Sequence, residues 1–466
     1  MRTEPLGVAV AVAKLADYSH LVLSWIANDG YPVNVAVTAT MDPDAGTATF
    51  DPPAFASSEA DAPSGLDIPP GAEITLTGSH IRPQPGYGYD ERRHVSVWGP
   101  TTRSGASVVL HGTGAWGWDE QEVPFFEYSE RSVGQSRRYF DSLSAERGTP
   151  VKPRLSLGWL ILRTTRLPFL SAAIVPVVLG IAIAAAHGFF DPLAAVLTVV
   201  GASFVQLGLN VANDVFDAAL GADDANVTPT KYSGGSRVIQ YGLVTFRQMA
   251  TLATAFYVAA AVVGLVLLAL RGSIALLVIG IVGFVVSLAY TAPPLKLVYR
   301  GLGEIAVAIG FGPLMLLGTY VVQTGGLLSW EPVVASIPVA LFIALVLYVN
   351  EIPDRRGDAR AGKRTLPVRF PAEAVVLGYD VAVAAAYGTV VAGVVAGLLP
   401  LTTLLALLSI PLALRVHRGL QPNYDNPYGL MAVMGVNVQL HLAVGVLLLA
   451  AYVLVVIANA IAPGVR

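Results

Sequence analysis

Long apolar runs fill the chain from about Leu167 onward, and they restrict its fold more than any other feature. Their lengths are close to the roughly 20 residues that an α-helix needs to cross the hydrocarbon core of a bilayer. We predict nine such spans, at residues 168–187, 192–212, 249–270, 273–290, 302–322, 332–350, 374–396, 399–416 and 431–459. Charged residues make up only 13% of the chain, against roughly 25% in soluble domains. Residues 151–466 are therefore predicted to form an all-α polytopic membrane bundle of nine transmembrane helices.

Basic residues are distributed unevenly between the two sides of this predicted bundle. If residues 1–150 are cytoplasmic, the flank before the first span and the loops after the even-numbered spans are cytoplasmic too. These segments hold Lys152, Arg154, Arg163, Arg166, Lys231, Arg237, Arg247, Lys296, Arg300, Arg355, Arg356, Arg360, Lys363, Arg364, Arg369, Arg415 and Arg418. The opposite side has only Arg271 and Arg466. Because cytoplasmic loops carry the excess of Lys and Arg, we predict a multi-pass cell-membrane protein with a cytoplasmic N-terminal domain and its C-terminus on the opposite side.

The first 150 residues have a different pattern, which predicts a separate soluble domain. Apolar and polar residues alternate within 20–28, 31–40, 47–51, 72–80, 94–99 and 106–118, as is typical of strands. Residues 125–146 have the spacing of an amphipathic helix. We predict a mainly-β, cytoplasmic β-barrel closed by this helix. It resembles the flavin-binding split-barrel proteins, which would imply a flavin, but no phosphate-binding motif supports that ligand.

The remaining composition excludes several classes of site. The chain has no cysteine, so disulfides, thiolate metal sites and thiol nucleophiles are excluded. Its formal net charge is −3, which gives no reason to expect a nucleic-acid partner. The chemistry of this protein is therefore expected among its carboxylates, amides and basic side chains.

An acidic cluster follows the second apolar run. On a helix, Gln206, Asn210, Asn213, Asp214 and Asp217 fall at i, i+4, i+7, i+8 and i+11, which places them on one face. Ionisable groups at a membrane are costly and are by default functional candidates. We therefore expect this face to carry a site at the cytoplasmic end of the helix.

A second cluster follows the sixth apolar run. Asn350, Asp354 and Asp358 fall at i, i+4 and i+8, again on one helical face. Pro353 has no N–H group and is expected to kink or end the helix. Both clusters follow even-numbered spans, so both are predicted to lie on the cytoplasmic side.

Two acidic clusters that face each other need a compensating charge. Their carboxylates would repel strongly in a medium of low dielectric, and Mg²⁺ typically joins one or two carboxylates to substrate phosphates. Basic residues suited to phosphate oxygens follow each cluster: Lys231, Arg237, Lys296, Arg300, Lys363 and Arg364. The residues predict a diphosphate held through Mg²⁺ between two aspartate walls, on a substrate with a long apolar tail. The alternative, loop acids that merely balance basic loops, does not explain why two such clusters occur on one side.

Three stretches carry a resemblance to a known family. They are NDVFD with GADD and GGSRVIQYGLV, YTAPPLKLVYRGLGEIAVAIGFG, and NEIPDRRGDARAGKRTLPVR. They are similar to the three cytoplasmic signatures of the UbiA superfamily of intramembrane prenyltransferases, over about residues 155–460. The variant is most similar to the 1,4-dihydroxy-2-naphthoate prenyltransferases of menaquinone biosynthesis. One departure is the Asn350–Pro353 stretch, where many of those enzymes have an arginine before the aspartate.

The resemblance implies a Mg²⁺-dependent enzyme that transfers a polyprenyl group from a prenyl diphosphate to an aromatic acceptor, with loss of CO₂ if that acceptor is 1,4-dihydroxy-2-naphthoate. The implied catalytic and metal-binding residues are Asp214, Asp217, Asp354 and Asp358. The implied substrate-binding residues are Asn210, Asn213, Lys231, Arg237, Tyr290, Lys296, Arg300, Asn350, Lys363 and Arg364. Tyr290 either stabilises a cation through its ring face or anchors the membrane interface.

The sequence leaves alternatives for the substrate and for three polar residues. The acceptor is alternatively 4-hydroxybenzoate, a glycerol-phosphate lipid, a porphyrin or a chlorin. A transporter of a divalent cation or a phosphorylated solute is an alternative of another class, but it would place its acids near the membrane midplane. In the ninth span, interhelical hydrogen bonding is favoured over substrate contact as the role of Asn437, Gln439 and His441.

Overall fold

The structure is a computed structural model, and it describes residues 6–53, 67–69, 71–84, 88–123, 125–152, 155–226 and 228–461. Every predicted site residue lies in these ranges, whereas Arg154 and Arg466, which entered the charge argument, lie outside the described residues. The chain divides into two compact units, Met1–Gly134 and Gln135–Arg466. The division falls within helix α2, Phe125–Arg147, and the predicted boundary after residue 150 follows the end of that helix.

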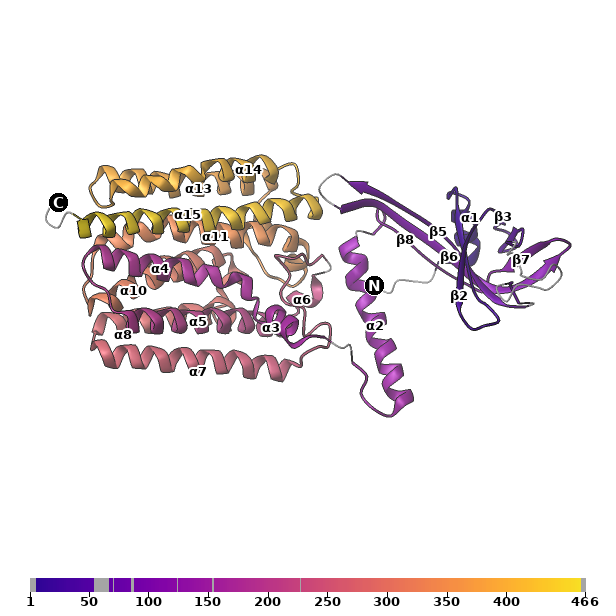
Figure 1. Cartoon of the computed structure of the whole chain (residues 1–466), viewed down its shortest axis with the longest axis horizontal. Coiled ribbons are helices and arrows are strands. Elements are labelled where there is room, and N and C mark those ends of the chain that lie inside the picture. The colour runs from indigo at the N-terminus through magenta and orange to yellow at the C-terminus, as the bar shows by residue number, and fades with distance from the viewer. Residues whose placement is uncertain are drawn as a thin grey trace. The chain divides into compact units, whose positions relative to one another are not determined.

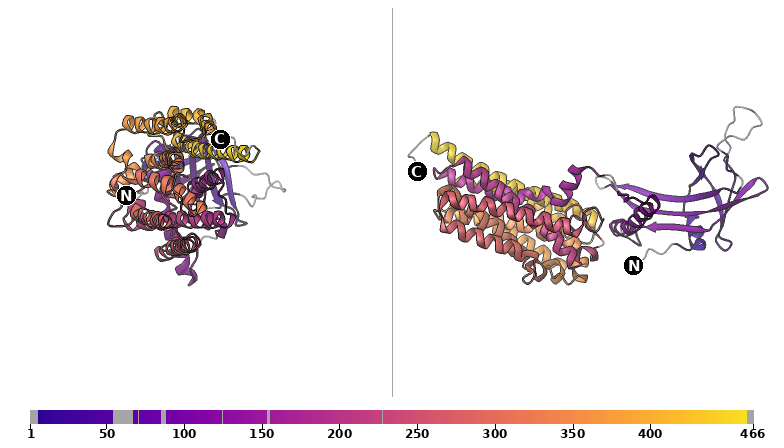
Figure 2. Two further views of the ribbon diagram at one scale, coloured as in Figure 1. Left: turned by 90° about the vertical axis from the view of Figure 1, so that its left-hand side faces the viewer. Right: turned by 90° about the horizontal axis from the view of Figure 1, so that it is seen from below.

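The second unit is a bundle whose long helices run side by side (Figures 1 and 2). Within the described residues, 9 helical segments are long and apolar enough to cross a membrane. They are η1–α4 (Leu167–Leu170, Ser171–Ala186), α5 (Pro192–Ala219), α7 (Phe246–Arg271), α8 (Ile274–Thr291), α9–η3–α10 (Gly303–Ile309, Gly310–Leu314, Met315–Thr324), α11 (Trp330–Arg360), α13 (Ala372–Val395), η4–α14 (Leu401–Ser409, Ile410–Leu420) and α15 (Pro427–Ile461). The predicted nine-helix membrane bundle is confirmed.

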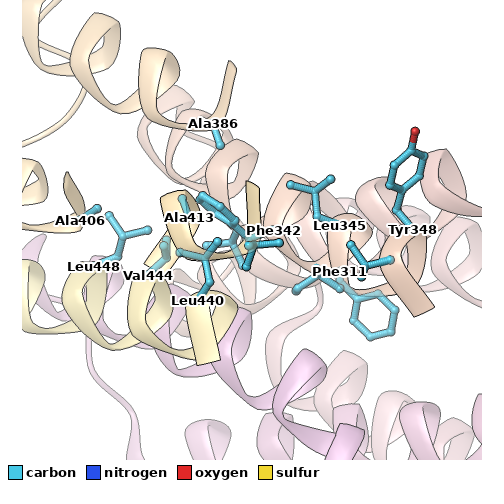
Figure 3. Packing of buried hydrophobic residues seen from close by; sticks show 14 of the residues in the cluster. Phe311, Phe342, Leu345, Tyr348, Ala386, Ala406, Ala413, Leu440, Val444 and Leu448 are labelled. Atoms are coloured by element: carbon cyan, nitrogen blue, oxygen red, sulfur yellow. The ribbon is translucent and has the colours of Figure 1, made fainter. Parts of the chain in front are cut away.

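Helix α11 lies at the centre of the bundle, whereas α7 and α8 lie at its surface. Of the most apolar window of each helix, 72% is buried in α11, against 17% in α7 and 11% in α8. Phe342 and Leu345 of α11 belong to the main apolar cluster together with Leu440 and Val444 of α15 (Figure 3). Lipid is as apolar as these side chains, so close packing rather than burial from water favours helix association here. The apolar surfaces of α7 and α8 are suited to contact with lipid.

Helix α11 continues past Pro353 to Arg360, so of the two expected outcomes, a kink or an end of the helix, the end is wrong. Tertiary contacts hold the last turns in place. Arg355 Nη1 donates to the carbonyl of Tyr424 at 3.3 Å, and the carbonyl of Pro353 accepts a hydrogen bond from Thr228 Oγ1 at 3.3 Å. Gly357 packs so closely that a Cβ there would lie 2.7 Å from the Cα of Asn226. The extension keeps Asp354 and Asp358 on a regular helix.

Short elements lie in the segments that connect these helices near the ends of α5 and α11. They are α3 (Leu157–Thr165), α6 (Ala222–Ala225), η2 (Leu297–Arg300) and α12 (Leu366–Arg369). Ser156 caps α3, since its side chain accepts a hydrogen bond from the N–H of Trp159. Gly221 has φ +78°, a conformation that glycine adopts without steric cost, and it lets the chain turn from α5 into α6. These segments bring the loop after α5 over the end of the bundle.

The first unit contains an antiparallel sheet of 8 strands in the order β2-β1-β5-β6-β7-β4-β3, with β8 paired to β6. The strands are β1 (Leu21–Ile26), β2 (Pro32–Val37), β3 (Ala39–Asp42), β4 (Thr47–Phe50), β5 (Glu73–Gln84), β6 (Gly88–Ser104), β7 (Ser107–His111) and β8 (Gly114–Asp119). Strand β6 pairs with β5 and β8 along its first part and with β7 over Thr101–Ser104. The sheet therefore bends at β6 around a core that includes Leu23, Leu76 and Leu110.

The predicted mainly-β domain is confirmed, but its closure differs from the prediction. Among the described strands no pairing joins the end strands β2 and β3, so hydrogen bonds do not close a barrel there. The helix that enters the core is α1 (Val8–Leu15), which buries Ala11, Val12 and Leu15 and which the sequence analysis did not predict. Helix α2 forms where predicted, and the Tyr128 ring near its start stacks on Trp118 with centroids 4.6 Å apart.

Candidate active site

A cavity of about 400 Å³ lies among the C-terminal turns of α5 and α11, the loop after α6, and the start of α4. One part of its lining is polar and includes Asp217, Asp354 and Asp358. Another part is apolar, with Leu209, Val307, Phe311, Ile343, Val346 and Leu347. The volume is in the range of small-molecule sites. The structure thus brings side chains of both predicted clusters into one cavity with an apolar region.

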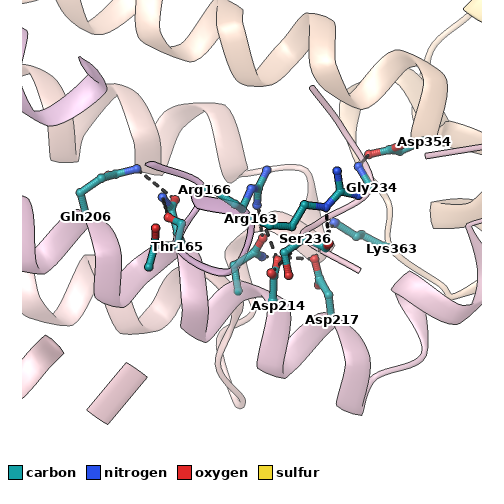
Figure 4. Close-up of polar contacts among 12 residues, drawn as sticks. Arg163, Thr165, Arg166, Gln206, Asp214, Asp217, Gly234, Ser236, Asp354 and Lys363 are labelled. Atoms are coloured by element: carbon teal, nitrogen blue, oxygen red, sulfur yellow. Dashed lines mark hydrogen bonds and ion pairs between the residues drawn. The ribbon is translucent and has the colours of Figure 1, made fainter. Parts of the chain in front are cut away.

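The α5 wall, defined as Asn210, Asn213, Asp214 and Asp217, is tied into the surrounding protein (Figure 4). The carboxylate of Asp217 accepts a hydrogen bond from the hydroxyl of Tyr299 at 2.7 Å. Its other oxygen accepts from Asn213 Nδ2 at 3.2 Å and from Lys363 Nζ at 3.3 Å. Both oxygens of Asp217 therefore have donors, and one donor is a full positive charge.

The other aspartate of the α5 wall faces an arginine and a backbone amide. The N–H of Ser236 donates to Asp214 Oδ2 at 3.1 Å. The Arg166 guanidinium lies 3.7 Å from Asp214 Oδ1 and donates to Asn213 Oδ1 at 3.4 Å. Asp214 is 2% exposed, so this ion pair is protected from solvent and is screened less than a surface pair.

Asn210 connects the α5 wall to the chain before the first span. Its Nδ2 donates to the carbonyl of Thr165 at 3.0 Å, and its Oδ1 accepts from Gln206 Nε2 at 3.0 Å. These bonds fix the end of α3, and with it Arg166, against α5. Asn210 therefore positions neighbouring groups as well as lining the cavity.

The α11 wall, defined as Asn350, Glu351, Asp354 and Asp358, has fewer partners. Asp354 accepts hydrogen bonds from Asn226 Nδ2 at 2.8 Å and from the N–H of Gly234 at 2.9 Å. Asp358 lies 3.8 Å from Lys363 Nζ. Among the described residues, no hydrogen-bond donor reaches Asp358 Oδ2 or Asn350 Oδ1, and Glu351 pairs with the carboxyl group of Glu304. A buried acceptor without a donor costs free energy, so these oxygens are suited to a cation or a ligand.

The glycine-rich loop after α6 bridges the two walls. Gly234 and Gly235 have φ +78° and +72°, which favours glycine. A Cβ on Gly235 would lie 3.0 Å from Asp223 Oδ1 and 3.2 Å from Asp214 Oδ1. The backbone N–H groups of Gly234 and Ser236 donate to the carboxylates of Asp354 and Asp214. The loop therefore sets the separation of the two walls.

Burial and neighbouring charges shift the pKa values of two groups that lie next to the walls and outside the membrane spans, Asp223 and Lys363. Burial, reinforced by the Asp217 and Asp214 carboxylates, raises the pKa of Asp223 well above its usual value. Burial would by itself lower the pKa of Lys363, but the carboxylates of Asp217, Asp358 and Glu351 raise it well above its usual value. Lys363 is therefore an ammonium that lies between the two walls.

The predicted basic residues separate into two groups in the structure. Lys231 and Lys363 line the cavity, as does Tyr290. Arg237, Lys296, Arg300 and Arg364 are not part of its lining. Arg237 is buried and donates to the carbonyl of Asp223, and Arg300 donates to the carbonyl of Pro294 at 3.0 Å. Spacing in the sequence does not reveal which way such a loop side chain turns.

Several lining residues did not enter the predicted site. Arg163 and Arg166 line the cavity, although the sequence analysis used them only for membrane orientation. Asn226 and Glu351 also line it, and Tyr299 bonds directly to Asp217. One signal was available for the arginines, since they directly precede the first span on the same side as both acidic clusters. Asn226 had none, because it reaches Asp354 across 128 residues of sequence.

The donor set fits a hard divalent cation that is shared with a ligand. Within the described ranges, no three acidic or histidine side chains converge closely enough to hold a metal ion by themselves. Asn350 Oδ1 and Asp358 Oδ2 belong to residues that line the cavity, and neither has a hydrogen-bond donor among the described residues. Asp214 Oδ1 has no such donor either, but Asp214 is not part of the cavity lining. Mg²⁺ prefers oxygen ligands and commonly combines one or two carboxylates with phosphate oxygens and water. The arrangement fits a cation that enters together with an anionic substrate.

Comparison with known proteins places this geometry in a family. Residues 173–431 match the UbiA prenyltransferase family. A 1,4-dihydroxy-2-naphthoate octaprenyltransferase of Bacillus subtilis is 26% identical over 65% of this chain and 94% of its own length. One from Mycobacterium tuberculosis is 33% identical over 52% of this chain and 80% of its own. The apo structure of a UbiA homolog from Aeropyrum pernix is 17% identical, covers 61% of this chain and 98% of its own, and has a TM-score of 0.47. The bundle with the two acidic walls is that of a multi-pass membrane prenyltransferase, and the chain belongs to the UbiA prenyltransferase family.

Proposed function

We propose that this enzyme transfers a polyprenyl group from a prenyl diphosphate to 1,4-dihydroxy-2-naphthoate, with loss of CO₂, in a Mg²⁺-dependent reaction of menaquinone biosynthesis. One observation carries the proposal: the α11 wall lines a single cavity together with Asn210, Asn213 and Asp217 of the α5 wall, and the cavity is apolar elsewhere. A charged diphosphate suits the polar part, and an isoprenoid chain suits the apolar part. The naphthoate acceptor follows the names of relatives that this chain resembles.

The walls would hold the diphosphate through both metal and cationic side chains. Asp214, Asp217, Asp354 and Asp358 would bind Mg²⁺, with Asn350 as a neutral ligand. When bound, Mg²⁺ neutralises charge that develops on the leaving diphosphate. Lys363, Lys231, Arg163 and Arg166 line the same cavity and would donate hydrogen bonds to the diphosphate oxygens, which are strengthened by charge. Such preorganised donors stabilise the departing group without reorganising at the moment of reaction.

The apolar residues would protect the reactive centre once the allylic C–O bond breaks. Leu209, Phe311 and Ile343 leave little polar surface at which water can bind, and exclusion of water prevents quenching of an allylic cation. Tyr290 lines the cavity, and its ring face would stabilise that cation. An electron-rich carbon of the acceptor then forms the new C–C bond, and the carboxyl group of the naphthoate leaves as CO₂.

We further propose that the cavity lies on the cytoplasmic side of the membrane. Arg163, Arg166, Lys231 and Lys363 line it, whereas Arg271 follows the outward end of α7 and pairs with Asp191 at 2.6 Å. This asymmetry is the one expected when basic residues mark the cytoplasmic side. Labelling of single cysteines introduced at positions 231 and 271 in intact cells and in inverted vesicles would test it.

Product analysis tests the reaction. The purified full-length protein is incubated with Mg²⁺, prenyl diphosphates of several chain lengths and a panel of aromatic acids, and products are identified by mass. We expect a prenylated, decarboxylated product from 1,4-dihydroxy-2-naphthoate, and none after EDTA treatment. Asp380→Asn, in α13, is the control, since Asp380 pairs with His417 and does not line the cavity. Transfer to 4-hydroxybenzoate alone would reassign the acceptor, and absence of transfer to any acceptor would contradict the proposal.

A further inference from the structure

Three polar residues of α15 differ in how their hydrogen bonds are satisfied. Asn437 accepts from the hydroxyl of Tyr379 at 3.0 Å and donates to the carbonyl of Leu345 at 2.8 Å, so interhelical bonding accounts for it. Gln439 is exposed on the surface of the bundle. His441 is only 3% exposed and lines the cavity. The role expected for all three from the sequence therefore holds for Asn437 alone.

His441 is a buried side chain with a single polar neighbour. The backbone of Ser171 pairs with one ring nitrogen, and no other described residue is a hydrogen-bond partner of the ring. Each nitrogen of an imidazole donates or accepts a hydrogen bond, and leaving one unpaired in an apolar bundle is costly. A ligand in the cavity can pair with that nitrogen.

A second unpaired polar atom lines the same cavity. Gln206 of α5 is 4% exposed, and its Nε2 donates to Asn210, but its Oε1 has no donor in the described part of the chain. Helix α4 packs against both α5 and α15, and its first residues, Ser171 and Ala172, line the cavity with Gln206 and His441. Two polar side chains, each with an unpaired atom among the described residues, thus line one cavity beside the start of α4.

The position of Gln206 separates this polar pair from the diphosphate site. Gln206 precedes Asp217 by three turns on α5, which is about 16 Å along the helix axis at the rise of an α-helix. The prenyl diphosphate headgroup is held near Asp217 in the proposed function, so Gln206 lies one turn beyond Asn210, at the far end of the α5 wall. Aromatic rings of Phe169 and Phe311 line the cavity as well.

The chemistry of the pair defines the ligand. Gln206 Oε1 only accepts hydrogen bonds, and a neutral imidazole offers one acceptor and one donor. An isoprenoid chain has no polar group to offer, and a diphosphate would be repelled by an amide oxygen. A ring hydroxyl donates to either acceptor and brings an apolar body that suits the aromatic rings. We propose that His441 and Gln206 form a specificity pocket that binds the hydroxyl groups of the aromatic acceptor, an inference that rests on the proposed function.

The test compares acceptors and variants in the full-length enzyme. His441→Phe and Gln206→Leu should each raise KM for 1,4-dihydroxy-2-naphthoate about tenfold, the loss expected for one buried hydrogen bond. The wild type should bind this acceptor more tightly than 1-hydroxy-2-naphthoate, measured as an inhibition constant, and His441→Phe should lose that discrimination. His441→Gln, which keeps an acceptor oxygen, should recover most of it. Gln439→Leu, on the same helix but outside the cavity lining, is the matched control.

A binding measurement separates failure of this pocket from failure of the fold or of the proposed function. Binding of geranyl diphosphate with Mg²⁺ should be unchanged within about twofold in both His441 variants, because His441 contacts no residue of the two acidic walls among the contacts that the structure gives it. Absence of transfer by the wild type would refute the proposed function. Transfer by the wild type, together with unchanged acceptor KM and unchanged discrimination in His441→Phe, would overturn the pocket alone.

Discussion

The two acidic walls of the cavity differ in how their charge is balanced. In the α5 wall, Asp217 has donors on both carboxylate oxygens, including Lys363, and Asp214 lies beside Arg166. In the α11 wall, Asp354 is held by a side-chain amide and a backbone N–H, and buried oxygens of Asn350 and Asp358 have no donor among the described residues. The negative charge of the α5 wall is thus compensated by protein side chains, whereas the α11 wall is suited to an added cation.

The largest expected effect is on turnover, and it should be the same in both walls. Asp217→Asn and Asp354→Asn each remove a charged ligand of the proposed metal site, so we expect kcat to fall by about three orders of magnitude or more, as for other losses of electrostatic stabilisation. Prenyl transfer is the measurement, and Asp380→Asn is the control. Turnover within tenfold of the wild type in either variant would remove that wall from the catalytic site.

The next effect concerns the cation shared by the walls. Lys363 lies 3.3 Å from Asp217 and 3.8 Å from Asp358, so Lys363→Met leaves both carboxylates with less compensation. Breaking a buried pair costs about 3 kcal/mol, and we expect a lower unfolding midpoint in detergent and about a hundredfold lower kcat. Lys231→Met, which removes an exposed lysine of the same cavity, should leave the midpoint unchanged. Equal midpoints for the two variants would argue against Lys363 as the bridge.

A smaller effect should distinguish the walls directly. Mg²⁺ with pyrophosphate is expected to raise the unfolding midpoint of the wild type by several degrees, because a ligand that binds only the folded state stabilises it. Asp358→Asn should raise the midpoint of the metal-free protein, since it removes a buried carboxylate that shares the Lys363 ammonium with Asp217 and has no donor on Oδ2 among the described residues. It should also reduce the gain from Mg²⁺ and pyrophosphate. Tyr299→Phe should lower the metal-free midpoint instead. The comparison fails if Asp358→Asn destabilises the metal-free protein as Tyr299→Phe does.

The smallest effect is a pH dependence beside the α5 wall. The folded-state pKa of Asp223 is raised, by burial first and then by Asp217 and Asp214, so its ionisation opposes folding. This destabilisation develops as pH rises from the unfolded value of about 3.9 through the folded pKa, and it is complete above it. Asp223→Asn should therefore raise the unfolding midpoint of the metal-free protein, and more at pH 8 than at pH 5. Asp224→Asn, which replaces the exposed neighbour, should show no such pH difference.

Much of the bundle follows from local patterns in the sequence. Apolar runs of bilayer length located the nine spans, and helical spacing placed Asp214 with Asp217 and Asp354 with Asp358 on single faces. Alternation also located most strands of the first unit, but not α1 or the order of the sheet. Length, periodicity and charge are properties of neighbouring residues, so they can be read without a structure.

The tertiary structure alone decided which side chains meet. Asn226 reaches Asp354 across 128 residues, and Lys363 reaches Asp217 across 146. Packing of the loops determined that Arg166 lines the cavity while Arg300 does not, and that α11 continues through Pro353. It also left one ring nitrogen of His441 without a partner among the described residues, whereas Asn437, one helical turn earlier, is fully hydrogen-bonded. The sequence by itself determined the elements and the chemistry that they carry, because these depend on short-range period and composition; the contacts that join the elements depend on long-range packing and appear only in the folded chain.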